Sequence, residues 1–331
     1  MKRLNAITDV PGIRVGHASD FKALTGCTVI LCEEGATGGV DIRGTAAATR
    51  QIDALSLLHL VDQVHAILLT GGSAFGLDAT GGVMSFLEER GKGFDVIKTK
   101  VPSVPTAVIF DFGIGDHRVR PDRETGYQAC LNASRKVEEG SVGAGTGATV
   151  GKLFGIERAM KGGVGTSSIL GPKGLVVGAL VVVNAFGDIF DPKTGEILAG
   201  ARRSNKSLHF ANSTRWIKAG VSRKQFGAVV TSDSSSFNTT LGVIATNANF
   251  SKKEIHQVAQ IAHSGLAKMI SPLHSTFDGD LIFAISYGKK KADVNTVGLL
   301  GEAALIESVQ RAIVKADGFG IIPAYMDLHK V

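Results

Sequence analysis

The chain has 331 residues, of which 44% are hydrophobic and 20% are charged. This composition provides for a large packed core and carries too much charge for an integral membrane protein. The net charge of +6 invites a nucleic-acid hypothesis, but Lys289–Lys291 is the only run of three basic residues and no aromatic residue interleaves it. We therefore expect neither a nucleic-acid nor a membrane partner, and we interpret the lysine run as a solvated loop.

The N-terminal segment and the cysteines favour a cytoplasmic protein. Lys2 and Arg3 are not followed by the apolar segment of a secretory signal. Cys27, Cys32 and Cys130 have neither metal-binding nor redox spacing, and they are interpreted as small buried residues in a reducing compartment. The nine histidines form no H-x-x-x-H or HExxH pair. We expect no metal and no cofactor.

Apolar runs and helical periodicity indicate an α+β protein without a linker, so a single domain over residues 1–331 is expected. The expected strands are 27–32, 66–70, 175–186, 227–231, 239–246 and 281–287. Helices are expected over 76–90, 123–136 and 296–314, and another helix follows the capping box Ser251-Lys-Lys-Glu254. Continuous apolar strands between amphipathic helices favour helix-covered sheets, such as a layered αββα sandwich.

Three glycine-rich motifs resemble nucleotide-binding or catalytic motifs in spelling only. Gly143-Ala-Gly-Thr-Gly-Ala148 matches a dinucleotide fingerprint, but the residues before it have the pattern of a helix end and not of a strand. Gly151-Lys152 lacks the first glycine of a P-loop. Ser73 lacks the second glycine of a nucleophile elbow, because Phe75 occupies that position. We therefore interpret Ser73 as a helix N-cap or a main-chain anion site.

The segment Thr231-Ser-Asp-Ser-Ser-Ser-Phe-Asn-Thr239 is a polar loop that runs directly into an apolar strand. It is open to two interpretations. It is either an ordinary loop before a strand or a self-cleavage site at the Asn238–Thr239 bond. In the second case the Thr239 hydroxyl attacks the preceding carbonyl, and hydrolysis of the resulting ester exposes a new N-terminal threonine. The α-amine, with a reference pKa of about 7.7–8.0, then serves as the base for the hydroxyl of the same residue.

The segment that begins at Thr239 and five further ordered motifs resemble the L-aminopeptidase/D-esterase (DmpA) family, which includes β-peptidyl aminopeptidases, and the resemblance covers essentially the whole chain. Thr239-Thr-Leu-Gly-Val-Ile-Ala-Thr246 is similar to the start of the family's small subunit. The other motifs are Gly71-Gly-Ser-Ala-Phe-Gly-Leu-Asp-Ala79, Val142–Lys152, Lys161–Ser168, Val182–Gly187 and Phe277-Asp-Gly-Asp280.

This resemblance implies a four-layer αββα sandwich of the DmpA/ornithine acetyltransferase type. It also implies self-cleavage into a large subunit, 1–238, and a small subunit, 239–331, which remain together in homo-oligomers of heterodimers. The substrate would be a small peptide or an aminoacyl amide. By position, Thr239 is the nucleophile, Asn184 donates to the oxyanion, and Asp278 and Asp280 flank the nucleophile. Tyr127 and Glu124 align loosely with a tyrosine and with the carboxylate that binds the substrate amine.

Other interpretations stay open from the sequence. Asn184 also fits a polar strand end, and Asp278-Gly-Asp280 fits a tight turn. Asn247 stands where the family usually has an aspartate, which suggests the loss of an acidic group near the nucleophile. The alternative functions are a glutamate or ornithine N-acetyltransferase, whose small subunit also begins with threonine, and a non-catalytic relative that binds a small ligand.

Overall fold

The strands form a large nine-stranded sheet and three small sheets within residues 3–222 and 238–329, which the computed structural model describes. The strands are β1 Arg14–Asp20, β2 Thr25–Ile42, β3 Thr49–Arg50, β4 Gln63–Thr70, β5 Phe94–Asp95, β6 Lys100–Val101, β7 Thr106–Val108, β8 Thr149–Val150, β9 Met160–Lys161, β10 Gly163–Leu170, β11 Val176–Asn184, β12 Asp188–Phe190, β13 Ile197–Ala199, β14 Thr239–Ala248, β15 Ile270–Ser271 and β16 Leu281–Lys290. The helices are α1 Ala79–Glu89, α2 Arg123–Leu131, α3 Ser213–Lys218, α4 Lys252–Met269 and α5 Val294–Val314.

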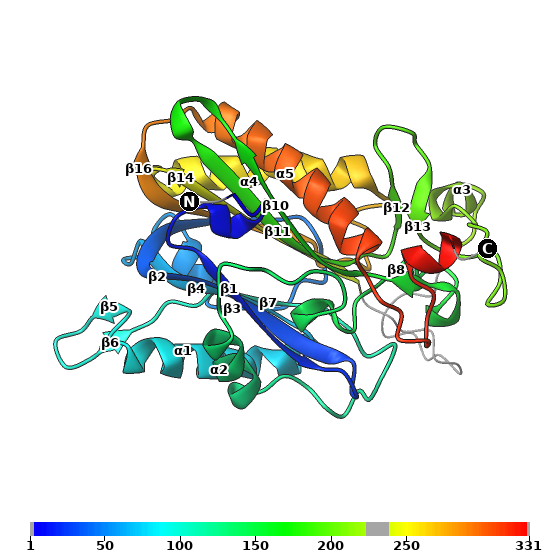
Figure 1. Cartoon of the computed structure of the whole chain (residues 1–331), viewed down its shortest axis with the longest axis horizontal. Helices are drawn as coiled ribbons and strands as arrows, with labels where there is room; N and C mark the ends of the chain where they lie inside the picture. Colours follow the sequence, from blue (N-terminus) through cyan, green and yellow to red (C-terminus); the bar gives the residue numbers. More distant parts are fainter. Residues whose placement is uncertain (1–2, 223–237, 330–331) are drawn as a thin grey trace.

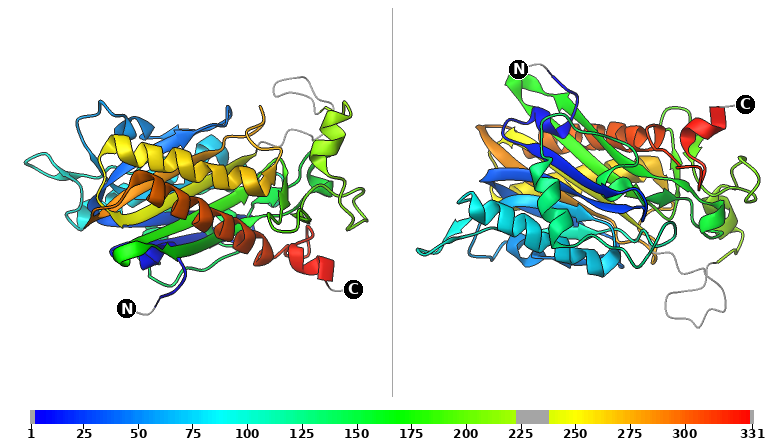
Figure 2. Two further views of the ribbon diagram at one scale, coloured as in Figure 1. Left: turned by 90° about the horizontal axis from the view of Figure 1, so that it is seen from above. Right: turned by 60° about the horizontal axis from the view of Figure 1, so that its bottom comes forward.

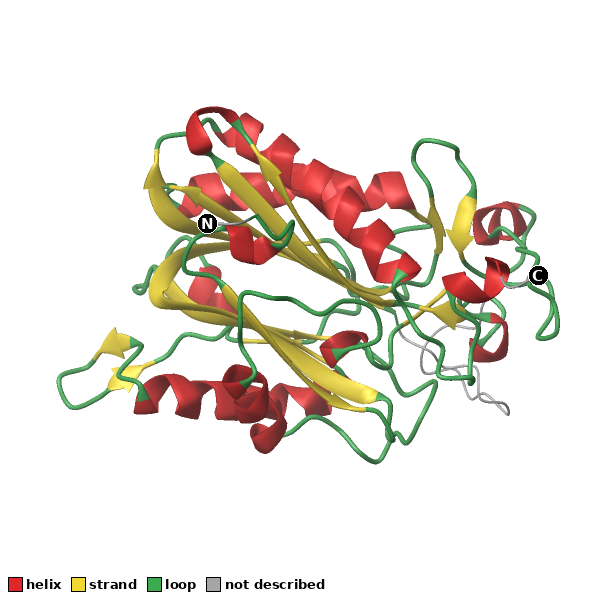
Figure 3. Ribbon diagram, viewed as in Figure 1, coloured by secondary structure: helices red, strands yellow, loops and turns green. Residues whose placement is uncertain are grey.

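The large sheet has the order β10-β11-β14-β16-β2-β4-β7-β3, with β1 paired to β2. The long strand β2 belongs to both halves, because its first part pairs with β4 and its last part pairs with β16. The register with β4 shifts between Leu31 and Ala36. The two halves of the sheet lie face to face, with α4 and α5 on one outer face and α1 and α2 on the other (Figures 1 and 3).

Three buried cores separate these four layers. One core joins α4 and α5 to the half-sheet β10-β11-β14-β16. The second lies between the two half-sheets, and the third joins β2 and β4 to α1 and α2. Figure 2 shows α4 and α5 side by side over their half of the sheet. The expected four-layer αββα fold is confirmed.

Strand β11 illustrates why the central strands are apolar on both faces. Val177, Ala179, Val181 and Val183 face the helix-side core, whereas alternate residues such as Leu180 face the core between the sheets. Successive side chains of a strand point to opposite faces, so a strand covered on both sides reads as a continuous apolar run. The same alternation holds in β14 and β16.

Helix α4 begins as its sequence predicts. The Ser251 hydroxyl accepts a bond from the Glu254 amide, and the Glu254 carboxylate accepts one from the Ser251 amide at 2.8 Å. Helix α5 packs closely on α4 because it carries glycine at the contact. A Cβ at Gly298 would lie 2.7 Å from the Ile261 side chain. A larger residue there would push the two helices apart.

Several element boundaries differ from the sequence predictions. Strands β1 and β10 were not anticipated, because their sequences mix glycine and polar residues with few apolar ones. Helix α2 ends at Leu131, since the chain then turns so that Ser134 pairs with Val15 of β1. The predicted strand 227–231 lies outside the described residues.

The three cysteines are buried free thiols, as expected. Among the described helices, none has the length and apolar character that a membrane span requires.

Candidate active site

Thr239 lies where four central strands of the sheet meet. It is the first residue of β14, and it pairs directly with Asn184, the last residue of β11. On its other side, β16 begins at Leu281 and pairs with the end of β2 at Ile42. A central strand that has two further strands on each side is held rigidly at its end. Side chains from separate segments of the sequence are thereby placed together.

The Asn238–Thr239 peptide is buried and is held on both sides by the residues around Asp278. The Asn238 amide donates to the Phe277 carbonyl at 3.1 Å, and the Gly279 amide donates to the Asn238 carbonyl at 2.9 Å. The Thr239 hydroxyl also donates to that carbonyl oxygen, at 2.5 Å. The hydroxyl therefore lies next to the carbonyl group that precedes it, and a backbone N–H points at the same oxygen.

Asp278 and Asp280 both lie next to the backbone around this peptide, and both are buried. Asp278 forms an isolated bridge with Asn238, and its carboxylate accepts bonds from the Phe186 amide and from Ser275. Asp280 accepts a bond from the Thr240 amide at 2.7 Å. Burial and the neighbouring Asp280 carboxylate raise the pKa of Asp278 to about 7. Asp278 can therefore hold or release a proton near neutral pH.

His274 belongs to the same cluster, although the sequence did not point to it. Its Nδ1 lies 3.1 Å from Asp280 Oδ2, and its ring packs edge-on against His263 at 4.8 Å between centroids. His263 Nδ1 in turn lies 2.7 Å from Asp41 Oδ2. The two histidines lie eleven residues apart without any metal-binding spacing, so only the tertiary structure places them behind the aspartates. His274 bonds to Asp280 directly and His263 packs on His274, and neither histidine reaches Thr239 in any contact of the described residues.

The orientation of the Asn184 side chain is fixed by its donors. Its Oδ1 accepts bonds from the Thr149 amide at 3.0 Å and from Lys152 Nζ at 2.8 Å, and both of those groups can only donate. Its Nδ2 therefore points the other way, where one hydrogen bonds to the Phe110 carbonyl at 3.1 Å. Lys152 is the lysine of the rejected P-loop match. It is 1% exposed and positions Asn184 instead of a phosphate.

A cavity of about 540 Å³ opens beside Thr239. We call it the Thr239 cavity. It is lined by apolar residues and a few hydroxyl groups, namely Thr45, Ala46, Ala47, Ala48, Ser73, Phe75, Val108, Phe110, Phe112, Thr239 and Thr276. Ser73 is not a side-chain N-cap as predicted, because its φ is +51° and its amide donates to the Ile109 carbonyl. It forms part of the cavity wall instead.

The structure does not bring Tyr127 and Glu124 to this site. Both lie on α2, which packs on α1 in the outer helix layer (Figure 1). The Tyr127 hydroxyl donates to Glu89 at 2.7 Å, and its ring packs edge-on against Phe86. Glu124 is an exposed residue of the first helical turn. Neither residue lines the Thr239 cavity, so the loose alignment that suggested them was wrong in position.

Asn247 is also remote from Thr239. It lies eight residues further along β14, which corresponds to about 26 Å in an extended strand. Its side chain accepts a bond from the Val176 amide and donates to the Gly174 carbonyl. Asn247 therefore holds the far end of β11 to β14, and the expectation that this substitution changes the charge near the nucleophile was wrong.

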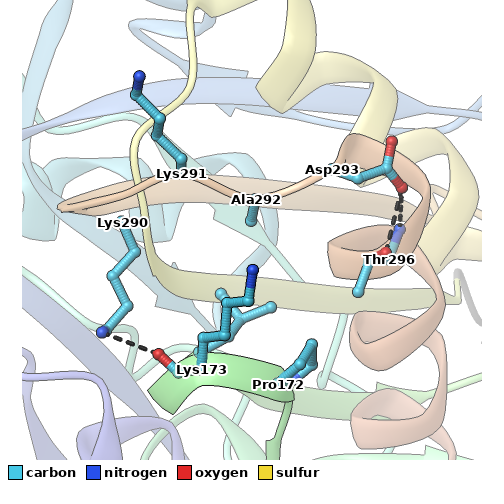
Figure 4. Close-up of a pocket in the computed structure, with 8 residues that line it drawn as sticks. Pro172, Lys173, Lys290, Lys291, Ala292, Asp293 and Thr296 are labelled. Atoms are coloured by element: carbon cyan, nitrogen blue, oxygen red, sulfur yellow. Dashed lines mark hydrogen bonds between the residues drawn. The ribbon is translucent and has the colours of Figure 1, made fainter.

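A second cavity, of about 410 Å³, lies at that far end of the sheet (Figure 4). Lys290 Nζ donates to the Lys173 carbonyl, and Asp293 caps α5 by accepting a bond from the Thr296 amide at 2.8 Å. Lys290 ends β16, so the lysine run is not wholly a loop as predicted. Because Asp293 already occupies the start of α5, this helix end does not offer its amides to an anion.

Comparison with known proteins identifies the family. The model of peptidase family S58 matches residues 5–318. An uncharacterised aminopeptidase of Mycobacterium bovis is 37% identical, over 98% of each chain. A 6-aminohexanoate-oligomer endohydrolase of an Agromyces species is 32% identical, over 84% of this chain and 74% of its own.

Two solved structures share the fold. A β-aminopeptidase of a Burkholderia species superposes with a TM-score of 0.68 at 20% identity, over 98% of this chain and 91% of its own. The L-aminopeptidase D-Ala-esterase/amidase of Ochrobactrum anthropi, described as a variant of the Ntn hydrolase fold, has a TM-score of 0.68 at 17% identity, over 95% and 86% of the two chains. The motifs, the layered fold and the family match agree, and the chain belongs to peptidase family S58.

Proposed function

We propose that this chain is a self-cleaving amide hydrolase whose nucleophile is Thr239, and that it acts on small peptides and aminoacyl amides. The observation that carries the proposal is the contact of the Thr239 hydroxyl with the Asn238 carbonyl, whose oxygen also accepts a bond from the Gly279 amide. A hydroxyl beside a carbonyl, with a fixed donor on the oxygen, is the arrangement that acyl transfer requires.

In the proposed self-cleavage, Thr239 Oγ1 attacks the carbonyl carbon of Asn238. The negative charge that develops on the carbonyl oxygen is stabilised by the Gly279 N–H. The C–N bond then breaks, the hydroxyl proton passes to the nitrogen of Thr239, and an ester joins Asn238 to Oγ1. Water hydrolyses this ester, which leaves a carboxylate on Asn238 and a free α-amine on Thr239.

In each later turnover the α-amine of Thr239 takes the proton of its own hydroxyl, and Oγ1 attacks the substrate amide. The second hydrogen of Asn184 Nδ2 and the Gly279 N–H serve as oxyanion donors in this proposal. The leaving amine takes the proton, and water then releases the acyl group from Oγ1. Relatives of the chain carry the names aminopeptidase and oligomer endohydrolase, and both activities break an amide bond.

The subunits 1–238 and 239–331 would stay joined after cleavage. Strands β14 and β16 of the small subunit lie between β11 and β2 of the large subunit, so separation would break two rows of backbone hydrogen bonds. Assembly of these heterodimers into a homo-oligomer is proposed from the family resemblance. A cytoplasmic location is proposed because all three cysteines are free buried thiols.

The mature protein is expected to contain two chains, and the smaller is expected to have 331 − 238 = 93 residues. Intact-mass measurement of the denatured protein at intervals after purification tests this. The masses of the two chains should add up to the mass of the uncleaved chain plus one water, because hydrolysis adds one water across the Asn238–Thr239 bond. A full-length species that never converts would contradict the self-cleavage.

Replacement of Asn184 by alanine is expected to lower kcat by about 10²–10³, the usual effect of losing one oxyanion donor. The variant Asn184→Asp is the matched test, because it keeps an acceptor for Lys152 and for the Thr149 amide but loses the Nδ2 donor. We expect a lower kcat in both variants. The melting temperature should fall more in the alanine variant, because the Lys152 ammonium loses one of its hydrogen-bond acceptors. Normal kcat in Asn184→Asp would limit Asn184 to a structural role.

A further inference from the structure

The walls of the Thr239 cavity carry no acidic side chain among the residues that the structure describes. Alanine, valine and phenylalanine make up most of the lining, and the polar groups are the hydroxyls of Thr45, Ser73, Thr276 and Thr239. Hydroxyl groups are neutral, so they orient a polar ligand without neutralising a charge. A cavity of this kind binds an apolar group well and offers no counter-ion to a buried ammonium.

A cation stacks on two of the rings in this wall. The Arg120 guanidinium lies 3.9 Å from the centroid of the Phe75 ring and 5.6 Å from that of Phe112. Both rings line the cavity. A guanidinium stacked on these rings disfavours a second positive charge close by and has no such effect on a neutral acyl group.

The carboxylates of the neighbourhood are engaged elsewhere. Asp111 follows Phe110 in the sequence, but its carboxylate is buried and accepts bonds from the Thr25 hydroxyl at 2.6 Å and from the Gly72 amide at 2.8 Å. Asp278 pairs with Asn238, Asp280 accepts a bond from the Thr240 amide, and neither residue lines the cavity. None of the three is placed to receive a substrate ammonium from the Thr239 cavity.

We propose that the Thr239 cavity recognises the acyl part of the substrate as an uncharged apolar group, so that a free amino group is not required for hydrolysis. The substrate class is therefore neutral acyl amides, including amide bonds inside a chain, in addition to aminoacyl amides. This inference rests on the proposed function of Thr239. It concerns only which acyl groups bind in the Thr239 cavity.

The test compares two p-nitroanilides that differ only in the α-amino group, phenylalanyl and 3-phenylpropanoyl. At pH 7 the neutral 3-phenylpropanoyl anilide is expected to have a kcat/KM about tenfold higher, because the ammonium loses its hydration without gaining a counter-ion. The ratio should fall towards one at pH 9, where an α-amine with a reference pKa of about 7.7–8.0 is mostly neutral. Since both anilides use the same nucleophile, the ratio cancels the pH dependence of Thr239.

A matched pair of variants at Ser73 tests the charge argument directly. Ser73 lines the cavity with a φ of +51°, a backbone region that asparagine and aspartate adopt more readily than most residues. Ser73→Asp should raise the preference for the phenylalanyl anilide at pH 7 by about tenfold, as a nearby opposite charge typically does. Ser73→Asn has nearly the same shape without the charge and should leave the ratio near that of the original protein.

The possible outcomes separate this inference from the proposed function. If the two-chain protein hydrolyses both anilides but prefers the phenylalanyl one by tenfold or more at pH 7, the cavity inference is wrong and the function stands. An equal gain of preference in Ser73→Asp and Ser73→Asn would also overturn it, because charge would then not be the cause. If neither anilide is hydrolysed by a protein that has cleaved itself, the proposed function fails and the inference fails with it.

Discussion

The Thr239→Ala variant is expected to remain a single chain of 331 residues and to hydrolyse no substrate above background. The replacement removes the hydroxyl that lies 2.5 Å from the Asn238 carbonyl oxygen and leaves the strand pairing to Asn184 intact. A methyl group cannot attack a carbonyl, so both self-cleavage and turnover should stop. Intact mass reports the first effect, and a substrate panel of aminoacyl amides reports the second.

Two further variants show whether the loss at Thr239 is chemical. Thr239→Ser keeps a hydroxyl and should cleave itself more slowly, because serine lacks the branched methyl that restricts the rotamer. Thr240→Ala is the neighbouring control. The buried Thr240 hydroxyl has no hydrogen-bond partner among the described residues, and the backbone amide at this position would still bond to Asp280. We expect the Thr240→Ala variant to cleave itself. Hydrolysis of substrate by the purified Thr239→Ala variant would show that the nucleophile is another residue.

Blocking the α-amine of Thr239 is expected to lower kcat by about 10²–10⁴ even though the hydroxyl is present. The experiment combines residues 1–238 with residues 239–331 that carry one glycine ahead of Thr239, both released from a cleavable fusion partner. The extra peptide bond turns the amine into an amide, which cannot accept the hydroxyl proton. Loss of a positioned general base typically lowers the rate by about 10²–10⁴. The same pair of chains without the glycine is the control for assembly.

The pH dependence adds a second measure of the base. With a free amine, kcat/KM should rise with pH as the ammonium loses its proton. Burial lowers the pKa of such an amine from the reference of about 7.7–8.0, and the nearby Asp280 carboxylate opposes that change. If the glycine-blocked protein assembles and still works, the Asp278–Asp280 pair becomes the base. Its activity should then rise around pH 7, where the Asp278 carboxyl ionises.

The sequence by itself determined the layered fold, the family and the position of the candidate nucleophile. The segments of β11, β14 and β16 are apolar at successive positions and not only at alternate ones, which predicts strands that are covered on both faces. The two cores on either side of β11 confirm this prediction. The Ser251–Glu254 capping box predicted the start of α4. These features depend on local patterns of a few residues, which a single sequence contains completely. The glycine-rich strand β10 has no such pattern. It becomes a strand because its glycines let α5 approach, as at Gly165, where a Cβ would meet the Ser308 carbonyl at 2.0 Å.

Only the tertiary structure decided how the residues around Thr239 are held. Asn184 pairs with Thr239 through strand register, and Lys152 orients Asn184 from a separate loop. His274 reaches Asp280 after a turn that no periodicity predicts. Sequence alignment placed Tyr127 near the nucleophile, whereas α2 carries it to the outer helix layer. Contacts between residues tens of positions apart depend on the register of the sheet and on which faces the helices cover. The register and the covered faces depend on the packing of the whole core, so they cannot be predicted from a short segment of the chain.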